Sequence, residues 1–297
     1  MRQKECVLFI GSGVSAWSGL PSWQQLLQQM LQFLEEHGLP RGEGEEIQSV
    51  INSGDLLMAA SICSSKMRHA DLRQFLDTTF IEPHPVPREI HELIVKLGPN
   101  AFITTNYDRL IDDAFQKWHD GLVLMPVNND QIIEQASILK HGSSRFIFTP
   151  HGRAEHAATV VLSREDYRKL QYASNSVIQT MTHFFLSRPI IYVGFGLRDP
   201  DFLMIKDQIS STFHGAEREH FAIVANASAM SKQYWHDSFG LTLVSYETVQ
   251  QEVRDSSGKL TIIHRHDHLE EWVGSSRVQN PHPNFAEDAK LGWGTLR

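Results

Sequence analysis

Short apolar runs alternate with stretches of helical spacing along most of this chain. The runs at residues 6–10, 101–103, 146–148, 189–193 and 221–225 are continuous, which is typical of strands covered on both faces. A further strand is predicted at 241–244. Between about residues 22 and 100, apolar side chains recur every three or four positions, which predicts a helical module. The pattern therefore predicts an α/β fold: a Rossmann-like, mostly parallel sheet with helices on both faces and a helical insertion or cap subdomain.

Few boundaries interrupt this pattern, so we expect a single domain over residues 1–297. Ser163 and Asp166 have the spacing of a capping box and predict the start of a helix. The polar stretch 247–259 is expected to be mobile. The last residues, about 275–297, have little apolar periodicity and are expected to form a C-terminal tail.

The first apolar run ends in a glycine turn, Gly11-Ser12-Gly13, ahead of a predicted helix start. Glycines let the backbone approach a pyrophosphate, and the N–H groups of such a turn can bind its charge. A tight turn in any α/β protein has the same pattern. A dinucleotide oxidoreductase also needs an acidic residue about 20 residues later, at the end of a second strand. Glu35 and Glu36 lie instead within helical spacing, which disfavours that class.

Polar residues follow the second apolar run directly, in the segment Thr104-Thr105-Asn106-Tyr107-Asp108. The carboxyl ends of parallel strands meet at one edge of a sheet, where ligands bind. An amide and a carboxylate placed there are expensive to bury without a ligand or a partner. Asn106 and Asp108 are therefore candidate site residues.

Two further strand ends carry unusual residues. His151 stands between Pro150 and Gly152 after the run 146–148, and a histidine at a strand tip suits acid–base catalysis, although a structural histidine is equally consistent. The run 189–193 leads into Gly194-Phe195-Gly196-Leu197-Arg198-Asp199. Asp199 has the pattern of a helix cap, whereas the two glycines ahead of it leave room for a ligand.

These four segments together resemble the sirtuin family, and more closely its bacterial branch that lacks the zinc module. The resemblance extends from about residue 5 to about residue 245, and the segment 160–167 also resembles the defence-associated branch. Thr104–Asp108 matches the family's Thr-x-Asn-x-Asp segment, and His151-Gly152 matches its catalytic His-Gly.

The resemblance implies roles for individual residues. It implies that Asn106 orients the ribose and the attacking water, that His151 is the base, and that Asp108 supports the nicotinamide side of the pocket or orders the loop. It implies contacts to NAD from Gly11, Ser12, Gly13, Ser15, Thr105, Gly194, Phe195, Gly196, Asp199 and Asn226. A plain turn residue is an equally good interpretation of Asn226.

The departures from the family bear on the activity. Protein-deacylating sirtuins carry a zinc ribbon with four cysteines, whereas this chain has two, Cys6 and Cys63. A structural zinc site needs about four ligands, so no metal is expected. The histidine-rich segment 264–268 is not expected to bind a metal either, because no second set of ligands is evident. No counterpart of the strand that clamps an acyl-lysine peptide follows His151.

A nucleotide site without a peptide site remains. By the resemblance, this implies an NAD+ nucleosidase that takes NAD+ as its substrate and releases nicotinamide and ADP-ribose. By the same resemblance, it would act in bacterial antiphage defence through NAD depletion. One alternative is a non-catalytic module of a defence complex that binds NAD or ADP-ribose. A protein deacylase or ADP-ribosyltransferase is a weaker alternative. The choice between NAD and NADP stays open.

Charge and composition limit the partners. The formal charge of −8, without a basic stripe, argues against tight binding to nucleic acid. No apolar run has the length of a membrane span, and the first predicted strand begins too early for a signal peptide. Two distant cysteines suggest reduced thiols and a cytoplasmic location. We expect a homo-oligomer, and the resemblance adds a HerA-type ATPase as a possible partner.

Overall fold

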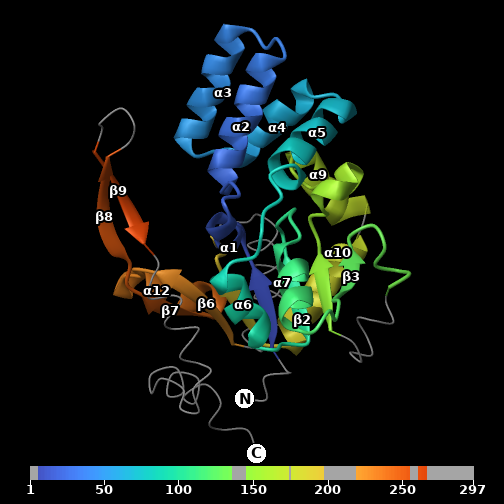
Figure 1. The fold of residues 1–297 in the computed structure, drawn as a ribbon, viewed down its shortest axis with the longest axis vertical. Coiled ribbons are helices and arrows are strands. Elements are labelled where there is room, and N and C mark those ends of the chain that lie inside the picture. Colours follow the sequence, from blue (N-terminus) through green and yellow to red (C-terminus); the bar gives the residue numbers. More distant parts are fainter. Residues whose placement is uncertain (1–5, 136–144, 174, 197–218, 255–259, 266–297) are drawn as a thin grey trace, which may run out of the picture.

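A seven-stranded, all-parallel sheet forms the centre of the molecule (Figure 1). The structure is a computed structural model that describes residues 6–135, 145–173, 175–196, 219–254 and 260–265. The strand order is β3-β4-β2-β1-β5-β6-β7, and every neighbouring pair is parallel. The strands are β1 Val7–Ile10, β2 Ala101–Thr104, β3 Met125–Asn128, β4 Phe146–Thr149, β5 Ile190–Val193, β6 His220–Ala225 and β7 Leu241–Tyr246. The predicted Rossmann-like fold is confirmed.

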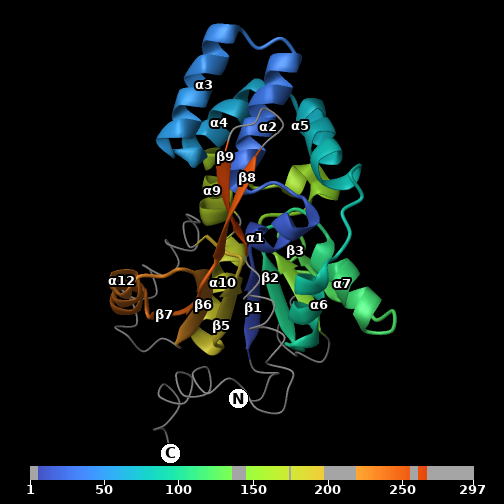
Figure 2. The ribbon, with the colours of Figure 1, turned by 60° about the vertical axis from the view of Figure 1, so that its left-hand side comes forward.

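The inner strands β1, β2, β4 and β5 are largely apolar because both faces of the sheet are covered there. Side chains of one face, such as Phe9 and Phe148, pack with helix α10 (Asn175–Ser187). Alternate residues on the other face, such as Leu8, pack with α6 (Glu89–Lys96) and α7 (Leu110–Trp118). Figure 2 shows these helices on opposite sides of the sheet. α12 (Ala229–Phe239) covers β7, and Trp118 and Trp235 are partly buried against these layers.

A block of helices lies beyond the carboxyl ends of the strands and has its own apolar core (Figures 1 and 2). It consists of α2 (Trp23–Glu36), α3 (Arg41–Ser53), α4 (Leu56–Lys66), α5 (His69–Leu76) and a π-helical turn (Asp77–Ile81). α9 (Arg164–Arg168) packs against α4, and the predicted capping box of Ser163 and Asp166 opens it. Of the predicted helical stretch 22–100, the last helix, α6, lies on the sheet instead.

The segment after β7 differs from the prediction. β8 (Val249–Arg254) and β9 (Leu260–Arg265) form an antiparallel hairpin that projects away from the main sheet (Figure 1). The strand at 241–244 is therefore not the last one, and the expectation of a mobile stretch over 247–259 is wrong for residues 249–254. Backbone pairing needs no apolar side chains, so a polar stretch can form a strand once a partner lies beside it. The predicted tail, 275–297, lies outside the described residues.

β1 is the central strand at which the topology reverses. The chain continues from β1 to β2 on one side and returns to β5 on the other side. In open parallel sheets, such a reversal leaves a crevice at the carboxyl ends of the two strands. No helix in the described part of the chain is long and apolar enough to cross a membrane.

Candidate active site

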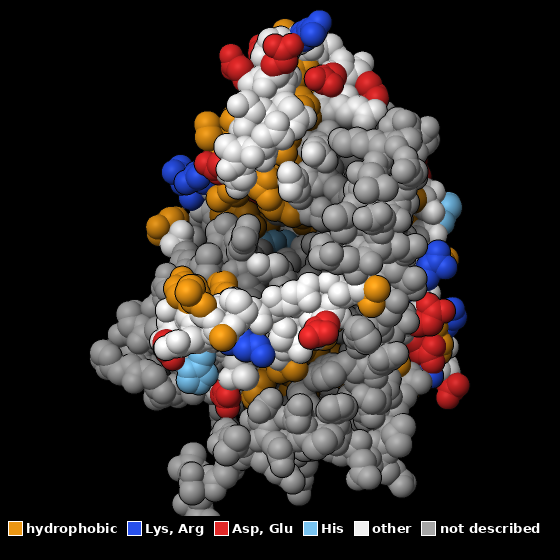
Figure 3. Space-filling model, turned by 90° about the vertical axis from the view of Figure 1, so that its left-hand side faces the viewer, with side chains coloured by type: hydrophobic (Ala, Val, Ile, Leu, Met, Phe, Trp, Pro, Cys, Tyr) orange, Lys and Arg blue, Asp and Glu red, His pale blue; other side chains and the backbone are white. Residues whose placement is uncertain are grey.

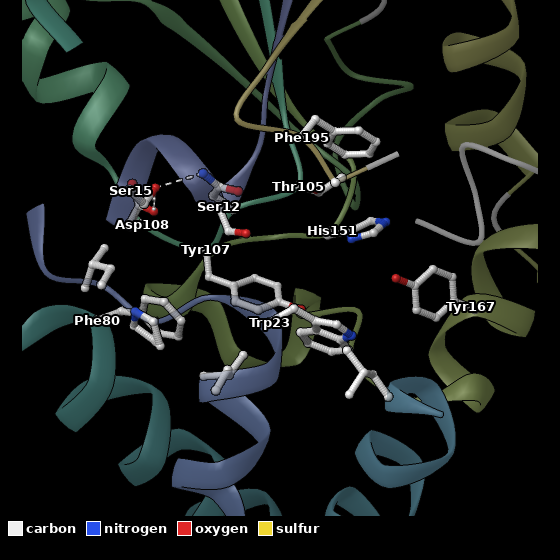
Figure 4. A pocket seen from close by; sticks show the side chains of 16 residues that line it. Ser12, Ser15, Trp23, Phe80, Thr105, Tyr107, Asp108, His151, Tyr167 and Phe195 are labelled. Carbon is white, nitrogen blue, oxygen red and sulfur yellow. Dashed lines mark hydrogen bonds between the residues drawn. The ribbon is translucent and has the colours of Figure 1, made fainter. Parts of the chain in front are cut away.

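A cavity of about 280 Å³ lies between the carboxyl ends of the strands and the helical block (Figure 4). Figure 3 shows the surface hollowed between these two parts. Turns after three strands, β1, β2 and β4, supply the polar lining, which consists of Ser12, Ser15, Thr105, Asn106, Asp108 and His151. The turn after β5 adds Phe195 and Gly196. The structure thus brings Asn106 and His151, predicted from separate motifs, into one cavity.

A chain of hydrogen bonds fixes the amide of Asn106. Asn106 Nδ2 donates to Ser15 Oγ at 2.8 Å, and Ser15 Oγ donates to Asp108 Oδ2 at 2.7 Å. Because the Ser15 proton is directed to Asp108, the serine oxygen is left to accept from Asn106. The opposite amide orientation would place two acceptors against each other. Asn106 Oδ1 therefore lies on the side of the amide away from Ser15.

Asp108 orders its own loop by accepting hydrogen bonds through both carboxylate oxygens. Its Oδ1 accepts a hydrogen bond from the Leu110 backbone N–H at 2.9 Å, at the start of α7. Burial raises the pKa of the Asp108 carboxyl above its ordinary value, and hydrogen bonds from Ser15 and Leu110 oppose part of that rise. This arrangement fits the second of the two roles expected for Asp108, the ordering of the loop.

Thr104 ties the same loop to β1. Its hydroxyl donates to the Ile10 carbonyl at 2.9 Å and accepts from the Asn106 N–H at 3.1 Å. Adjacent parallel strands alone would leave the turn free beyond their last pairing. The threonine therefore fixes the position of the Asn106 backbone relative to the glycine turn after β1.

His151 is held in an equally constrained loop after β4. Its side chain is buried, and its carbonyl accepts from the Val161 N–H at 3.0 Å. Gly152 has a φ of +77°, and a Cβ there would lie 2.3 Å from the Thr159 carbonyl oxygen, so the turn requires glycine. The Tyr167 ring meets the imidazole edge to face, with ring centroids 5.3 Å apart (Figure 4).

Aromatic and aliphatic residues form the other side of the cavity. Trp23, Phe80 and Tyr107, here called the aromatic wall, lie together below the polar residues in Figure 4. Phe80 and Tyr107 pack edge to face, with centroids 5.6 Å apart. The remaining lining is Leu20, Pro21, Leu26, Leu56 and Tyr167. Trp23, Leu26 and Leu56 could not be recognised as site residues from the sequence, because within a helical pattern they have the spacing of ordinary core positions.

The glycines after β1 serve close packing between two strand ends. A Cβ at Gly11 would lie 2.4 Å from the Gly194 carbonyl oxygen, and one at Gly13 would lie 2.9 Å from it. The Gly11 and Gly13 N–H groups donate to the carbonyls of Val193 and Gly194, both at 2.9 Å. These two amides are therefore engaged within the protein, whereas the glycine pattern predicted that they would face a phosphate.

A second cavity of about 350 Å³ adjoins the first through Phe195 and Gly196. Gly13 and Gly194 line it, together with the end of β6 from Ile223 to Ala225. Asn226 lines neither of these two cavities. It has a φ of +51°, and its side chain bonds to Thr248, as in a turn. Asp199 lies outside the described residues.

The described residues contain no group of three or more His, Cys, Asp or Glu side chains that could hold a metal ion. His266 and His268 of the predicted histidine cluster lie outside them. Both cysteines are buried, and burial raises the pKa of the Cys63 thiol to about 11. Since the thiolate is the metal ligand, such a thiol is a poor one near neutral pH.

Comparison with known proteins assigns a class to this fold and site. Residues 100–243 match the family described as SIR2-like domain, a range that contains Asn106, Asp108, His151 and Gly194. This match covers just under half of the chain and confirms the resemblance to sirtuins predicted from the sequence.

Named relatives refine the class. The chain is 23% identical over 223 residues to NAD(+) hydrolase ThsA of Bacillus cereus (strain MSX-D12), across 75% of this chain and 43% of the relative. It is 24% identical over 274 residues to Defense-associated sirtuin 2 of Bacillus subtilis, across 91% of this chain and 25% of the relative. The chain is thus a distant homologue of both proteins and spans less than half the length of each.

Among solved structures, one described as "Structural Basis for the Mechanism and Regulation of Sir2 Enzymes" aligns with a TM-score of 0.38 and 15% identity. The alignment covers 82% of this chain and 88% of the other.

Proposed function

We propose that this chain hydrolyses NAD+ to nicotinamide and ADP-ribose. The observation that carries the proposal is that Asn106 and His151 line one cavity, which also has an aromatic wall. Distant homologues bear the name NAD(+) hydrolase, which supports a reaction of the same kind here.

The two adjoining cavities match the two halves of the proposed substrate. Nicotinamide and its ribose would occupy the first cavity, with the pyridinium ring against the aromatic wall. A planar cation gains favourable electrostatic contact with aromatic faces. The diphosphate would pass Phe195 and Gly196, and the adenosine would occupy the second cavity. This path follows the crevice where β1 and β5 diverge, as expected for a nucleotide on a parallel sheet.

The reaction separates a good leaving group from an anomeric carbon. The bond between ribose C1′ and the pyridinium nitrogen breaks, and its electron pair neutralises the ring, which leaves as nicotinamide. Water attacks C1′ and loses a proton to His151, so the products are nicotinamide, ADP-ribose and one proton. Asn106 Oδ1 would accept a hydrogen bond from the attacking water or a ribose hydroxyl, which orients the reactants.

The proposal is tested by separating the products after incubation of the chain with NAD+. Asn106→Ala and His151→Ala should each lower nicotinamide release by about 100-fold or more, since each removes a group that acts on the reacting atoms. Asn52→Ala and His69→Ala change the same residue types at exposed positions of the helical block, and should leave the rate unchanged. Circular dichroism of every variant checks that the fold is retained.

Other outcomes would favour the alternatives. Calorimetric binding of NAD+ without nicotinamide release, with or without cell lysate, would support a non-catalytic binding module. Nicotinamide release that depends on an acyl-lysine peptide would support a deacylase. Equal rates for Asn106→Ala, His151→Ala and the unmodified chain would contradict the assigned roles.

The biological setting is proposed from the relatives. The name of the B. subtilis relative supports a role in defence, in which NAD depletion by the activated enzyme would stop growth of an infected cell. Assembly into a homo-oligomer and pairing with a HerA-type ATPase remain predictions from the resemblance. Assays with NAD+ and NADP+ in parallel would decide the substrate preference.

A further inference from the structure

Two of the loops that build the polar side of the cavity are fastened to each other. One follows β2 and carries Asn106 and Asp108, and the other follows β4 and carries His151. The Ala154 N–H donates to the Tyr107 carbonyl at 3.0 Å. The Tyr107 hydroxyl donates to the Val161 carbonyl at 2.7 Å. These two contacts join the loops, and neither of them involves Asp108 or the start of α7.

A buried ion pair between Arg153 and Asp112 adds a connection at Asp108 and the start of α7. The Arg153 residue is 6% exposed, and its Nη1 lies 2.9 Å from Asp112 Oδ2 in the first turn of α7. Nη2 donates to Asp112 Oδ1 at 3.1 Å, and Nη1 donates to the Asp108 carbonyl at 3.4 Å. One guanidinium therefore holds both the helix start and the backbone of the Asn106 loop.

The geometry of this pair is specific to arginine. A planar fork can meet two carboxylate oxygens and a carbonyl together, whereas an ammonium group is a point charge without that fixed shape. Taking two charges out of water is unfavourable, and a buried pair is often no more stable than apolar residues of similar volume. Stability alone is thus a weak reason for charges at this place.

We propose that Arg153 and Asp112 are positioning residues, which hold the Asn106 loop and His151 at the separation that NAD+ cleavage requires. The inference rests on the proposed function. Neither residue lines the cavity, so both act through other groups. Arg153 is two residues from His151, and Asp112 is four residues from Asp108. A displacement of about 1 Å at a reacting group can lower a rate about 100-fold.

The double variant Arg153→Met/Asp112→Leu separates positioning from stability, because it replaces both charges with apolar side chains of similar size. It should fold and melt near the unmodified protein, while kcat falls about 10- to 100-fold and KM changes less than about threefold. Arg153→Lys keeps the charge without the fork and should recover little of kcat. The exposed pair Arg41 and Glu45, changed to Met and Leu, is the matched control and should leave kcat unchanged.

Hydrogen exchange measured by mass spectrometry gives a readout that needs no turnover. In the Arg153→Met/Asp112→Leu variant, amides of residues 105–110 and 151–161 should exchange at least about tenfold faster, while those of β1 and β5 stay unchanged. Equal exchange in both loops would overturn the inference whether or not NAD+ is cleaved, and so would an unchanged kcat in a folded variant. If the unmodified protein cleaves no NAD+ but the double variant shows the faster loop exchange, the proposed function alone is overturned.

Discussion

Ser15 is the residue on which the orientation of Asn106 depends. Its hydroxyl donates to Asp108 and accepts from Asn106, so one oxygen connects the carboxylate to the amide. Without that oxygen, the two orientations of the amide would become similar in energy. Asn106 would then present Oδ1, an acceptor, in some molecules and Nδ2, a donor, in others.

Ser15→Ala should therefore lower kcat about 10- to 100-fold with a smaller effect on KM, because misorientation affects the reacting groups more than binding. Steady-state assays of nicotinamide release measure both constants. Ser65→Ala removes an exposed hydroxyl in α4 and should leave kcat unchanged. A Ser15→Ala enzyme with unaltered kcat would contradict the orienting role.

His91 is a second residue with a measurable effect, here on stability. It is fully buried in α6, where its Nδ1 accepts from the Arg88 N–H at 3.1 Å, and burial lowers its pKa to about 4 from 6.5. The unfolded chain binds a proton at higher pH than the folded chain does. Stability should therefore be complete above pH 6.5 and fall as the pH drops towards 4, by about 3 kcal/mol in all.

Urea unfolding at pH 7, 6, 5 and 4 tests this expectation. His91→Gln keeps an acceptor at the third helical position and removes the titration, so its free energy of unfolding should vary less with pH. His69→Gln, at an exposed position, should keep the full dependence of the unmodified protein. Identical pH profiles for His91→Gln and the unmodified protein would refute the assignment.

At the scale of the element, the turn after β5 requires glycine at Gly194, because this residue packs closely against the turn after β1. Gly194 has a φ of +64°, and a Cβ there would lie 2.6 Å from the Val14 backbone nitrogen. Gly194→Ala should lower the free energy of unfolding by about 2 kcal/mol or more, through strain and displacement of α1 (Ser12–Ser15). Denaturant unfolding measures the change.

Gly196 in the same turn is the matched control. A Cβ there would meet no atom within 4 Å among the described residues. Gly196→Ala should change the free energy of unfolding by less than about 0.5 kcal/mol. Equal losses in the two variants would show that the close approach of the two turns is not what requires glycine at Gly194.

The sequence predicted the strands that are buried on both faces, because their apolar runs can be recognised. It missed the strands that lack such a run. The inner strands are apolar on both faces, so continuous runs identified them. β3 was missed because it is an edge strand in which Met125 and Pro126 are exposed. β8 was missed because its polar residues lack a strand pattern. In both elements the pairing partner, rather than the local sequence, decides the structure.

The same distinction applies to the candidate site. Asn106, Asp108 and His151 could be predicted to converge, because the carboxyl ends of parallel strands share one edge of the sheet. Trp23 and Phe80 could not, since only the packing of the helical block brings them to the cavity. The hydrogen bonds of Gly11 and Gly13 to the β5 turn also depend on tertiary contacts. A glycine turn predicts that another group lies close to its backbone, but it does not identify that group.

At the scale of the whole molecule, ligand binding should stabilise the sheet and the helical block together. The first cavity has walls from both, so a ligand there contacts both and is released when either unfolds. ADP-ribose at about 100 times its Kd should add about 2.7 kcal/mol to the free energy of unfolding. That corresponds to a rise in Tm of roughly 5 °C for a chain of this size.

Differential scanning calorimetry with ADP-ribose, AMP and nicotinamide measures this effect. AMP reaches only the second cavity in the proposed arrangement and should bind more weakly, so its shift at the same concentration should be smaller. No shift with ADP-ribose at millimolar concentration would contradict the placement of the substrate across the two cavities.

The central position of β1 also has a consequence for synthesis on the ribosome. β1 pairs with β2 and β5, whose residues begin at Ala101 and Ile190. At about 5–20 residues per second, the nascent chain carries an apolar strand without its second neighbour for roughly 10–40 s. During that interval one edge of β1 is open to pairing with other chains, so slower synthesis should lengthen the period in which the nascent protein can aggregate.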